Sequence, residues 1–496
     1  MSKLWRILFS SKSLTFASIC FLLLYGCSLY HRYVYIDDAW FGEQSYWFAK
    51  YGFPKTVTIK DFFGWDEHLF VYHKLNIIIG AAIIQLFGWS VYYLKVFTLI
   101  MYMLFLKLYR DFFINEHSRL SASHWHFAFI FIFTTPIFLS LSFTFRPEIL
   151  VMLLGFISYW GLEKYLKKLS KGWLSIAGIA AGLAFLTHLN GIMFCAGGFG
   201  LLLYNRKWKG LVHYTLLTAV IGGLYFYDLW QPGHFDQFLS QMTSWPDNIG
   251  TSYNAHGLSA KLHLLLTKLL SEHKRFFWSD RVLSASLIFL ISLLYIFKNV
   301  WNNHKNLILY LLIITVALNV FGSQIAERYL IYSFPYFGII VSVAMIRVVE
   351  EGSGLIKGLF ALLFIFQFAV GGKMLFEIYS KNNPAATTSS IALSPIKDSN
   401  ARILVPYEYI FNELGFRDLV SYKGFEYHQT VFGPFTQLSF FERASQLKID
   451  YIVLNEDVLL QRDKSFPFFK GGSIDENQFY SLYDSTPEGI ILKKKW

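Results

Sequence analysis

Long apolar segments recur along most of the chain. A helix that crosses a bilayer needs about 20 predominantly apolar residues, and eleven segments approach that length. They lie at roughly 13–30, 91–109, 127–144, 149–166, 172–188, 191–204, 211–227, 282–297, 307–322, 330–346 and 355–372. The pattern predicts an α-helical polytopic membrane protein with about eleven transmembrane helices.

A further apolar run, Ile77–Phe87, has only eleven residues. It is too short to cross untilted, so we expect it to be re-entrant or interfacial. With this run left out and the N-terminus inside, basic segments such as 167–171 and 205–210 fall on the inner side, as the positive-inside rule requires. Loops 31–90 and 228–280 then lie outside, together with the C-terminal part.

The pattern changes after the last apolar run. The polar stretch "SKNNPAATTSS" reads as a linker,. Beyond it, "ARILVPY" and "KIDYIVLN" are typical of buried strands, and "YEYIFNELGF" and "FFERASQLK" have helical spacing,. We therefore predict a membrane domain at 1–376 and a small extracytoplasmic α/β domain at 377–496. A role as a cap or as an acceptor-docking domain fits it better than an independent activity.

Composition agrees with a membrane protein. The chain of 496 residues is 54% hydrophobic and 16% charged, whereas soluble proteins have about 25% charged residues. The net charge of +11 does not indicate nucleic acid binding, because residues 381–496 hold 13 basic and 14 acidic residues and the excess lies between the apolar segments. Cys20, Cys27 and Cys195 all lie in apolar runs and form neither a disulfide framework nor a metal motif,.

On this topology, ionisable and polar residues gather at the outer ends of the helices. They are Asp37 and Asp38, His73 and Lys74, Arg146 and Glu148, His188 and Asn190, and Glu327 and Arg328. Single members have ordinary explanations, since arginines snorkel to headgroups and His188 fits a satisfied helix-end histidine. The set is harder to explain as anchoring, because anchoring needs no carboxylates and adjacent acids repel each other.

This mixture of groups suits chemistry on a lipid phosphate. Arginine and lysine bind phosphate, arginine in a bidentate manner. A carboxylate acts as a general base toward a hydroxyl group. The Asp37–Asp38 pair is also compatible with a hard metal ion, but no further oxygen ligands cluster beside it, and we expect no metal. The aromatic residues that follow, Trp40, Tyr46, Trp47 and Tyr51, predict an interfacial helix at headgroup level,.

Four stretches resemble one known family. "DDAWFGEQSYWFAKYG" after the first apolar run resembles the D-[DE]-A-x-[YF] signature of the GT-C glycosyltransferases, in the branch of the protein O-mannosyltransferases and lipid A aminoarabinose transferases. "FRPEIL" resembles the R-x-[DE] motif of that branch, and "ERYLIYSFPYFG" its R-Y-L-x-x-x-x-P segment. "HKLNIIIGAAIIQLFGWS" resembles the stretch that usually begins [HK]-P-P-L, but it lacks the two prolines.

The resemblance implies a GT-C-like fold and an inverting sugar transfer from a polyprenyl-phosphate donor at the outer membrane face. It implies that Asp37 is the catalytic base, Asp38 a helper acid and Glu148 a second active-site carboxylate. It also implies that Lys74 and Arg328 contact phosphate. Because the prolines are missing, His73 is a rival to Lys74, and Arg146 is a further candidate for the phosphate. No cofactor is implied, and the partners are the lipid-linked donor, a lipid, glycan or protein acceptor, and the bilayer.

Two other functions stay open at this point. A transporter or flippase of a lipid-linked anion would need polar sites at mid-depth and often internal repeats, and the sequence shows neither. A scaffold whose outer domain binds a partner is the third reading. For the enzyme, loop 228–280 is either a lid over the acceptor or an ordinary interfacial segment. The compartment we expect is a bacterial inner membrane, with the site and the C-terminal domain facing the periplasm.

Overall fold

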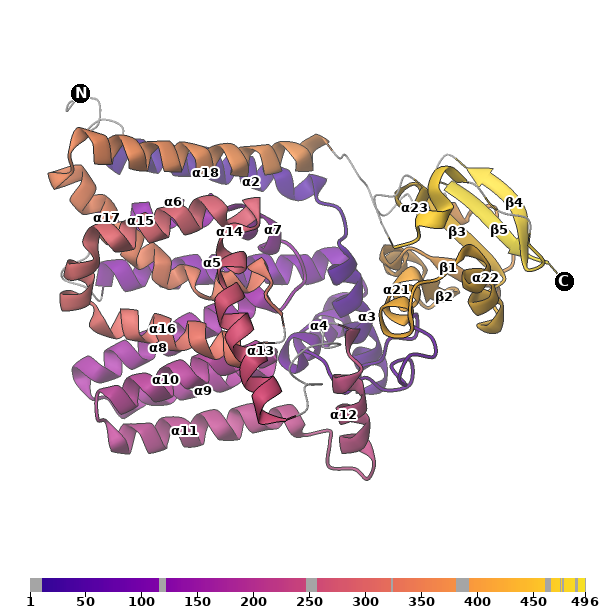
Figure 1. Cartoon of the computed structure of the whole chain (residues 1–496), viewed down its shortest axis with the longest axis horizontal. Helices are drawn as coiled ribbons and strands as arrows, with labels where there is room; N and C mark the ends of the chain where they lie inside the picture. Colours follow the sequence, from indigo (N-terminus) through magenta and orange to yellow (C-terminus); the bar gives the residue numbers. More distant parts are fainter. Residues whose placement is uncertain are drawn as a thin grey trace.

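The chain forms a bundle of long helices with a small mixed sheet at one end, as the computed structural model shows (Figure 1). The structure describes residues 11–115, 122–246, 257–322, 324–380, 392–459, 465–472, 474, 477–486 and 489–495. The predicted linker at 380–390 lies almost wholly outside the described residues.

The helices of the bundle lie side by side along the long axis of the molecule (Figure 1). The main helices are α2 (Ser11–Ser28), α5 (Val91–Asn115), α6 (Ala122–Phe133), α7 (Pro136–Leu141), α8 (Glu148–Lys168), α9 (Lys171–Thr187), α10 (Ile192–Tyr204), α11 (Trp208–Gly223), α15 (Asp280–Asn303), α16 (Lys305–Phe321), α17 (Phe334–Glu351) and α18 (Gly354–Ser380). Short 3₁₀ helices follow several of them, at η1 (Leu29–His31), η2 (Leu189–Gly191), η3 (Leu224–Phe226) and η5 (Glu327–Tyr332).

The number of membrane crossings stays a prediction. Within the described residues, four helices are long and apolar enough to span a bilayer, namely α5, α8, α15 and α18, and a bent pair from the region of α2 and the helix after it would add a fifth. The predicted run 127–144 is not one continuous helix. It divides into α6 and α7 around Thr134 and Thr135, because Pro136 starts a new helix and cannot continue the old one,.

Small residues allow close packing within the bundle. At Gly161 on α8, an added Cβ atom would lie 2.8 Å from the carbonyl oxygen of Trp173 on α9. At Gly155, it would lie 2.2 Å from the ring of Phe194 on α10. Such contacts exclude a larger side chain and bring the helices together, as is common in membrane proteins.

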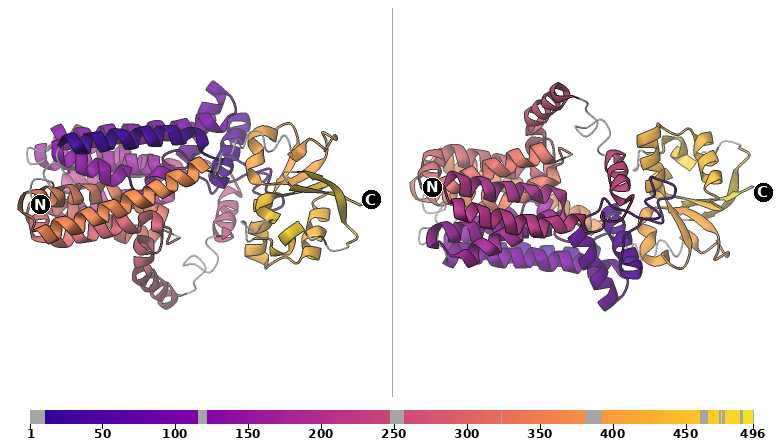
Figure 2. Two further views of the ribbon diagram at one scale, coloured as in Figure 1. Left: turned by 90° about the horizontal axis from the view of Figure 1, so that it is seen from above. Right: turned by 90° about the horizontal axis from the view of Figure 1, so that it is seen from below.

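A second group of elements lies between the bundle and the sheet (Figures 1 and 2). Helix α3 (Ile36–Tyr51) ends at Gly52, whose positive φ of 80° favours glycine, and its amide donates to the Phe48 carbonyl,. After the loop 53–73, α4 (Lys74–Phe87) packs against α3. The predicted short run at Ile77–Phe87 is therefore helical and falls short of the length of a membrane span.

Segment 228–280 contains three helices in its described residues: α12 (His234–Thr243), α13 (Leu258–Ser271) and α14 (His273–Phe277). Helix α12 is held against loop 53–73, since Gln241 accepts a hydrogen bond from the Phe70 amide at 2.8 Å and donates to the His68 carbonyl at 2.8 Å. Helix α13 projects from the side of the bundle (Figure 2).

The C-terminal sheet has the strand order β2-β1-β3-β5-β4. Strands β1 (Arg402–Val405), β2 (Asp418–Ser421) and β3 (Tyr451–Asn455) run parallel. Strand β5 (Gly489–Lys494) pairs antiparallel with β3, and β4 (Tyr480–Thr486) pairs antiparallel with β5 at the edge of the sheet. The helical elements of this part are η6 (Tyr407–Tyr409), α20 (Ile410–Glu413), α21 (Tyr422–Phe432), α22 (Gln437–Gln446), α23 (Glu456–Leu459) and η7 (Pro467–Gly472).

The segments predicted as strands form β1 and β3, and both predicted helical segments contain helix. Strands β2, β4 and β5 were not predicted from the sequence. Strand β4 is largely exposed, so it lacks the apolar run that marks β1 and β3.

The sheet docks on the bundle through one buried carboxylate. Glu43 on α3 accepts hydrogen bonds from the Thr58 hydroxyl at 2.6 Å, the Thr58 amide at 3.0 Å, the Trp47 indole at 3.2 Å and the Tyr407 hydroxyl at 2.8 Å. The Ser421 amide at the end of β2 donates to the Thr58 carbonyl at 2.8 Å. The carboxyl ends of β1 and β2 therefore face the loop that follows α3.

The sequence led us to expect Trp40 and Trp47 on a surface at headgroup level, but other parts of the protein cover both. Both are buried, and Trp40 packs edge-on against Trp245 and Tyr427. Loop 53–73 and the C-terminal segment cover this face of α3, and no short-range pattern signals that cover. Of the four aromatics, Tyr51 is the most exposed.

Replacing Glu43 is expected to weaken the contact between the C-terminal sheet and α3. Glu43→Ala leaves four buried donors without an acceptor, and we expect it to lower the unfolding temperature of the purified protein by about 5 °C. Tyr407→Phe removes one of the four bonds and should have a smaller effect. Thermal unfolding in detergent measures both, with the exposed Glu442→Gln as the control. An unchanged unfolding temperature for Glu43→Ala would show that the hydrogen bonds of Glu43 contribute little to stability.

Candidate active site

Arg146 joins two carboxylates from separate helices. Its Nε and Nη2 atoms bind Glu148, with distances of 3.0 Å from Nε to Oε2 and 2.7 Å from Nη2 to Oε1. Its Nη1 atom donates to Asp37 Oδ2. Two edges of one guanidinium thus bind two acids. This holds the start of α3 next to the start of α8.

Both acids stand in the first turn of their helices. Asp37 is the second residue of α3, and Glu148 is the first residue of α8, after Pro147. Negative charge is favourable at a helix N-terminus because the unpaired amides and the helix dipole carry partial positive charge. The local sequence therefore places each carboxylate at a helix end, and Arg146 draws the two ends together.

Arg328 completes the charged cluster from η5. Its Nε atom lies 3.6 Å from Glu148 Oε1, and Nη2 donates to Gln324 Oε1 at 2.7 Å. The side chain is 32% exposed, whereas Glu148 is 1% exposed. Arg328 is therefore the more accessible of the two arginines, since Arg146 is 11% exposed.

Two histidines line the same cluster. The rings of His73 and His188 stack, with centroids 4.3 Å apart, and His188 also meets Tyr329 edge-on at 5.6 Å. His188 Nδ1 accepts a hydrogen bond from the Asn190 amide at 2.9 Å, so that nitrogen carries no proton. Loss of hydration lowers the pKa of His73 to about 4, although the nearby Glu148 carboxylate opposes this shift,. With this pKa, His73 is neutral at pH 7.

Asp38 faces away from this cluster. It is fully buried, and its carboxylate accepts from the Tyr35 amide at 2.9 Å and the Phe145 amide at 2.6 Å. Lys95 Nζ on α5 lies 3.0 Å from Asp38 Oδ2. The adjacent acids Asp37 and Asp38 therefore do not share a site, because each pairs with its own cation in a different direction. Asp38 fixes the chain around Tyr35 and Phe145, on either side of the cluster.

Lys74 also has a partner outside the cluster. Its Nζ atom binds both oxygens of Asp228, at 2.6 and 2.5 Å, and lies 4.2 Å from the centroid of the Tyr72 ring. Burial lowers the pKa of Lys74 to about 8, while Asp228 acts in the opposite direction. The side chain is fully buried. Lys74 ties the start of α4 to the segment after η3, and its neighbour His73 lies beside Glu148 and Arg146.

The structure thus brings together five of the seven predicted site residues: Asp37, His73, Arg146, Glu148 and Arg328. It places Asp38 and Lys74 in separate ion pairs. The partners of those two, Lys95 and Asp228, were missed in the sequence. The sequence could have pointed to Lys95, since a lysine inside the predicted span 91–109 requires a buried partner. Asp228 carried a weaker signal, as an acid at the end of a span.

The cluster offers one carboxylate to a substrate. Asp37 is 39% exposed, whereas Glu148 is nearly inaccessible and holds two nitrogens of Arg146. The arrangement supplies an accessible acid–base group beside two guanidinium groups that suit a phosphate. Among the residues that the structure describes, no group of three or more His, Cys, Asp or Glu side chains is placed to hold a metal ion.

Comparisons with known proteins find a family match and a shared fold. Residues 74–227 match the family model of dolichyl-phosphate-mannose-protein mannosyltransferases. None of the curated proteins matches the chain. A similar solved structure is ArnT from Cupriavidus metallidurans bound to undecaprenyl phosphate, with a TM-score of 0.56 and 12% identity over 97% of this chain and 98% of that one.

The archaeal oligosaccharyltransferase AglB from Archaeoglobus fulgidus, in complex with an inhibitory peptide and a dolichol-phosphate, is also similar. Its TM-score is 0.53, with 11% identity over 96% of this chain and 74% of that one. At these identities the two structures establish a shared fold. The match extends beyond the membrane helices to nearly the whole of this chain.

The ion pair of Asp38 predicts a difference between the two adjacent acids. Asp38→Asn leaves Lys95 buried without a counter-charge, which costs about 3–5 kcal/mol. Asp37→Asn removes a partly exposed carboxylate and should change stability far less. Thermal unfolding of the purified variants measures the difference.

A rescue variant tests whether the unpaired charge of Lys95 causes the loss of stability. In Asp38→Asn with Lys95→Met, the unpaired ammonium is gone, so the double variant should be more stable than Asp38→Asn alone. If Asp38→Asn unfolds at the wild-type temperature, Asp38 does not have the structural role assigned to it.

Proposed function

We propose that this chain, which has the fold of the GT-C glycosyltransferases, moves a sugar from a polyprenyl-phosphate donor to an acceptor hydroxyl group. The resemblance seen in the sequence is confirmed by the family match over residues 74–227 and by the fold shared with ArnT and AglB. The same findings support a glycosyltransferase that uses polyprenyl phosphate. The finer assignments below rest on the geometry of this chain.

The observation that carries the proposal is the bridge from Asp37 through Arg146 to Glu148, with Arg328 beside it. In this cluster Asp37 is the exposed carboxylate and therefore the group that an acceptor can reach. Glu148 is buried and stays hydrogen-bonded to Arg146 Nε and Nη2. A donor phosphate that binds Arg146 Nη1 and Arg328 would compete with Asp37 for Arg146. Donor binding would thereby free the Asp37 carboxylate to accept the proton of the acceptor hydroxyl.

The proposed step moves one proton and one sugar. Asp37 takes the proton of the acceptor hydroxyl, and the oxygen attacks the anomeric carbon. The bond from that carbon to the phosphate oxygen breaks, and the electron pair leaves with the lipid phosphate. Arg146 and Arg328 stabilise the charge that develops on this leaving group. Attack from the side opposite the phosphate inverts the anomeric carbon.

In this arrangement, His73 is better placed than Lys74 to bind the donor phosphate. Lys74 is fully buried and paired with Asp228, whereas His73 stacks on His188 next to the arginines. A neutral imidazole donates one hydrogen bond to a phosphate oxygen without adding charge. Lys74 then acts as a positioning residue, because it fixes the first residue of α4 and with it His73.

The surrounding parts fit an acceptor that arrives from the sheet end of the bundle, where α8 begins and α18 ends. We propose that residues 377–496 form an acceptor-docking domain, that loops 31–90 and 228–280 flank the entrance, and that this face lies in the periplasm of a bacterial inner membrane. The transporter alternative is less well supported, because the charged cluster lies at helix ends and not at mid-depth.

Replacement of Asp37 tests the assignment of the base. Asp37→Asn keeps the size of the side chain and removes its basicity, so we expect transfer to fall by a factor of about 10²–10⁴. The assay is transfer of labelled sugar from a polyprenyl-phosphate donor by the membrane-inserted protein, with Glu350→Gln at the exposed end of α17 as a surface control. Wild-type turnover by a folded Asp37→Asn protein would rule out Asp37 as the base.

A further inference from the structure

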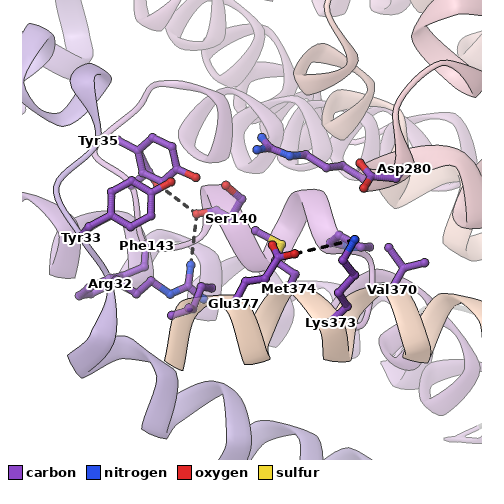
Figure 3. Close-up of a pocket in the computed structure, with 14 residues that line it drawn as sticks. Arg32, Tyr33, Tyr35, Ser140, Phe143, Asp280, Val370, Lys373, Met374 and Glu377 are labelled. Atoms are coloured by element: carbon purple, nitrogen blue, oxygen red, sulfur yellow. Dashed lines mark hydrogen bonds and ion pairs between the residues drawn. The ribbon is translucent and has the colours of Figure 1, made fainter. Parts of the chain in front are cut away.

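A second polar cavity lies at the same end of the bundle. It has a volume of about 220 Å³ and is formed by the chain after α2, the region of α7, the start of α15 and the end of α18 (Figure 3). Its cationic members are Arg32, Arg281 and Lys373. None of the residues of the Asp37–Arg146–Glu148–Arg328 cluster lines it.

Arg32 is buried in this cavity without an acidic partner. The residue is 8% exposed, and no ion pair of Arg32 is found among the described residues. Its Nη1 atom donates to the carbonyls of Leu139 and Ser140, and Nη2 reaches Ser28 Oγ at 3.4 Å. Its Nε atom has no hydrogen-bond partner within the described part of the chain. A buried guanidinium with an unused donor is costly, and a bound anion would offset that cost.

Arg281 adds a second guanidinium from the start of α15. Its side chain is half-buried and forms no ion pair with another described residue. Its charge acts on Tyr33, another residue that lines the cavity. Lys373 on α18 lies 3.8 Å from Glu377, a distance too long for a strong hydrogen bond, and both are exposed. Two arginines and one lysine around one cavity suit a single phosphate.

The remaining lining groups suit the rest of a lipid head. The carboxylates of Asp280 and Glu377 are acceptors for an ammonium or hydroxyl group, and they argue against a ligand that carries only negative charge,. Val370 and Met374 add apolar surface. Helices α2 and α18 lie next to the cavity and run along one edge of the bundle (Figure 1). They expose large apolar side chains such as Leu24 and Phe376. Acyl chains would find an apolar surface there.

We propose that this cavity binds the head of a glycerophospholipid, with the phosphate between Arg32 and Arg281 and a hydrogen-bond donor group near Asp280 and Glu377. Basic pockets between membrane helices bind phosphate-containing lipid heads on the cytoplasmic side of membranes, and the same charge pairing applies to this cavity. This site is separate from the proposed donor site, and lipid binding does not depend on the transferase activity.

Native mass spectrometry of the full chain in detergent tests the proposal, with phosphatidylethanolamine as the probe. The double variant Arg281→Gln with Lys373→Gln should bind the lipid about tenfold more weakly than the wild type. The matched control is Lys298→Gln with Lys357→Gln, which changes the same net charge at the opposite ends of α15 and α18. The control should bind like the wild type, and all three proteins should unfold at similar temperatures.

A second arm of the experiment uses undecaprenyl phosphate in place of the phospholipid. Its binding should be the same in the wild type and in Arg281→Gln with Lys373→Gln. Equal phosphatidylethanolamine binding by all three proteins would overturn the proposal. So would a selective loss of undecaprenyl phosphate binding in the double variant, because the cavity would then belong to the donor site.

Discussion

The ion pair network of Arg146 determines how the candidate site is built. Its guanidinium is shared between Asp37 at the start of α3 and Glu148 at the start of α8. Removal of one member of a buried pair such as Arg146–Glu148 typically costs about 3–5 kcal/mol, since the other charge remains buried, whereas Asp37 is partly exposed and contributes less,. The network is therefore both a structural joint and a reactive site. Two helix ends meet because of it, and Asp37 stays exposed at that meeting point.

The surrounding contacts keep this joint in register. Asp38 and Lys95 fix the backbone on both sides of it, through the amides of Tyr35 and Phe145. Lys74 and Asp228 fix the start of α4, which presents His73 to the cluster. Glu43 ties α3 to Thr58 and Tyr407, so the C-terminal sheet is attached to the helix that carries Asp37. Each of these ion or hydrogen-bond networks restrains an element that contributes a site residue.

Much of this arrangement could be predicted from the sequence, and the reason is topological. Residues at the ends of successive spans on one side of a membrane must lie near one another, which is how Asp37, Arg146, Glu148 and Arg328 could be grouped. The direction of each side chain could not be predicted. Asp37 and Asp38 are neighbours in the chain, yet they pair with Arg146 and Lys95 on different helices. Trp40 is covered in part by Tyr427 of the C-terminal segment, and the same segment is joined to α3 by the bond between Glu43 and Tyr407, which are 364 positions apart. No local pattern encodes such a contact.

The position of a bound lipid phosphate tests the account most directly. We suggest an experimental structure of the full chain in complex with undecaprenyl phosphate, the ligand found in the ArnT structure. The account predicts a phosphate within hydrogen-bond distance of Arg146 and Arg328, with the Asp37 carboxylate facing the space beyond it. A phosphate held by Lys74, or one in the cavity between Arg32 and Arg281, would contradict it.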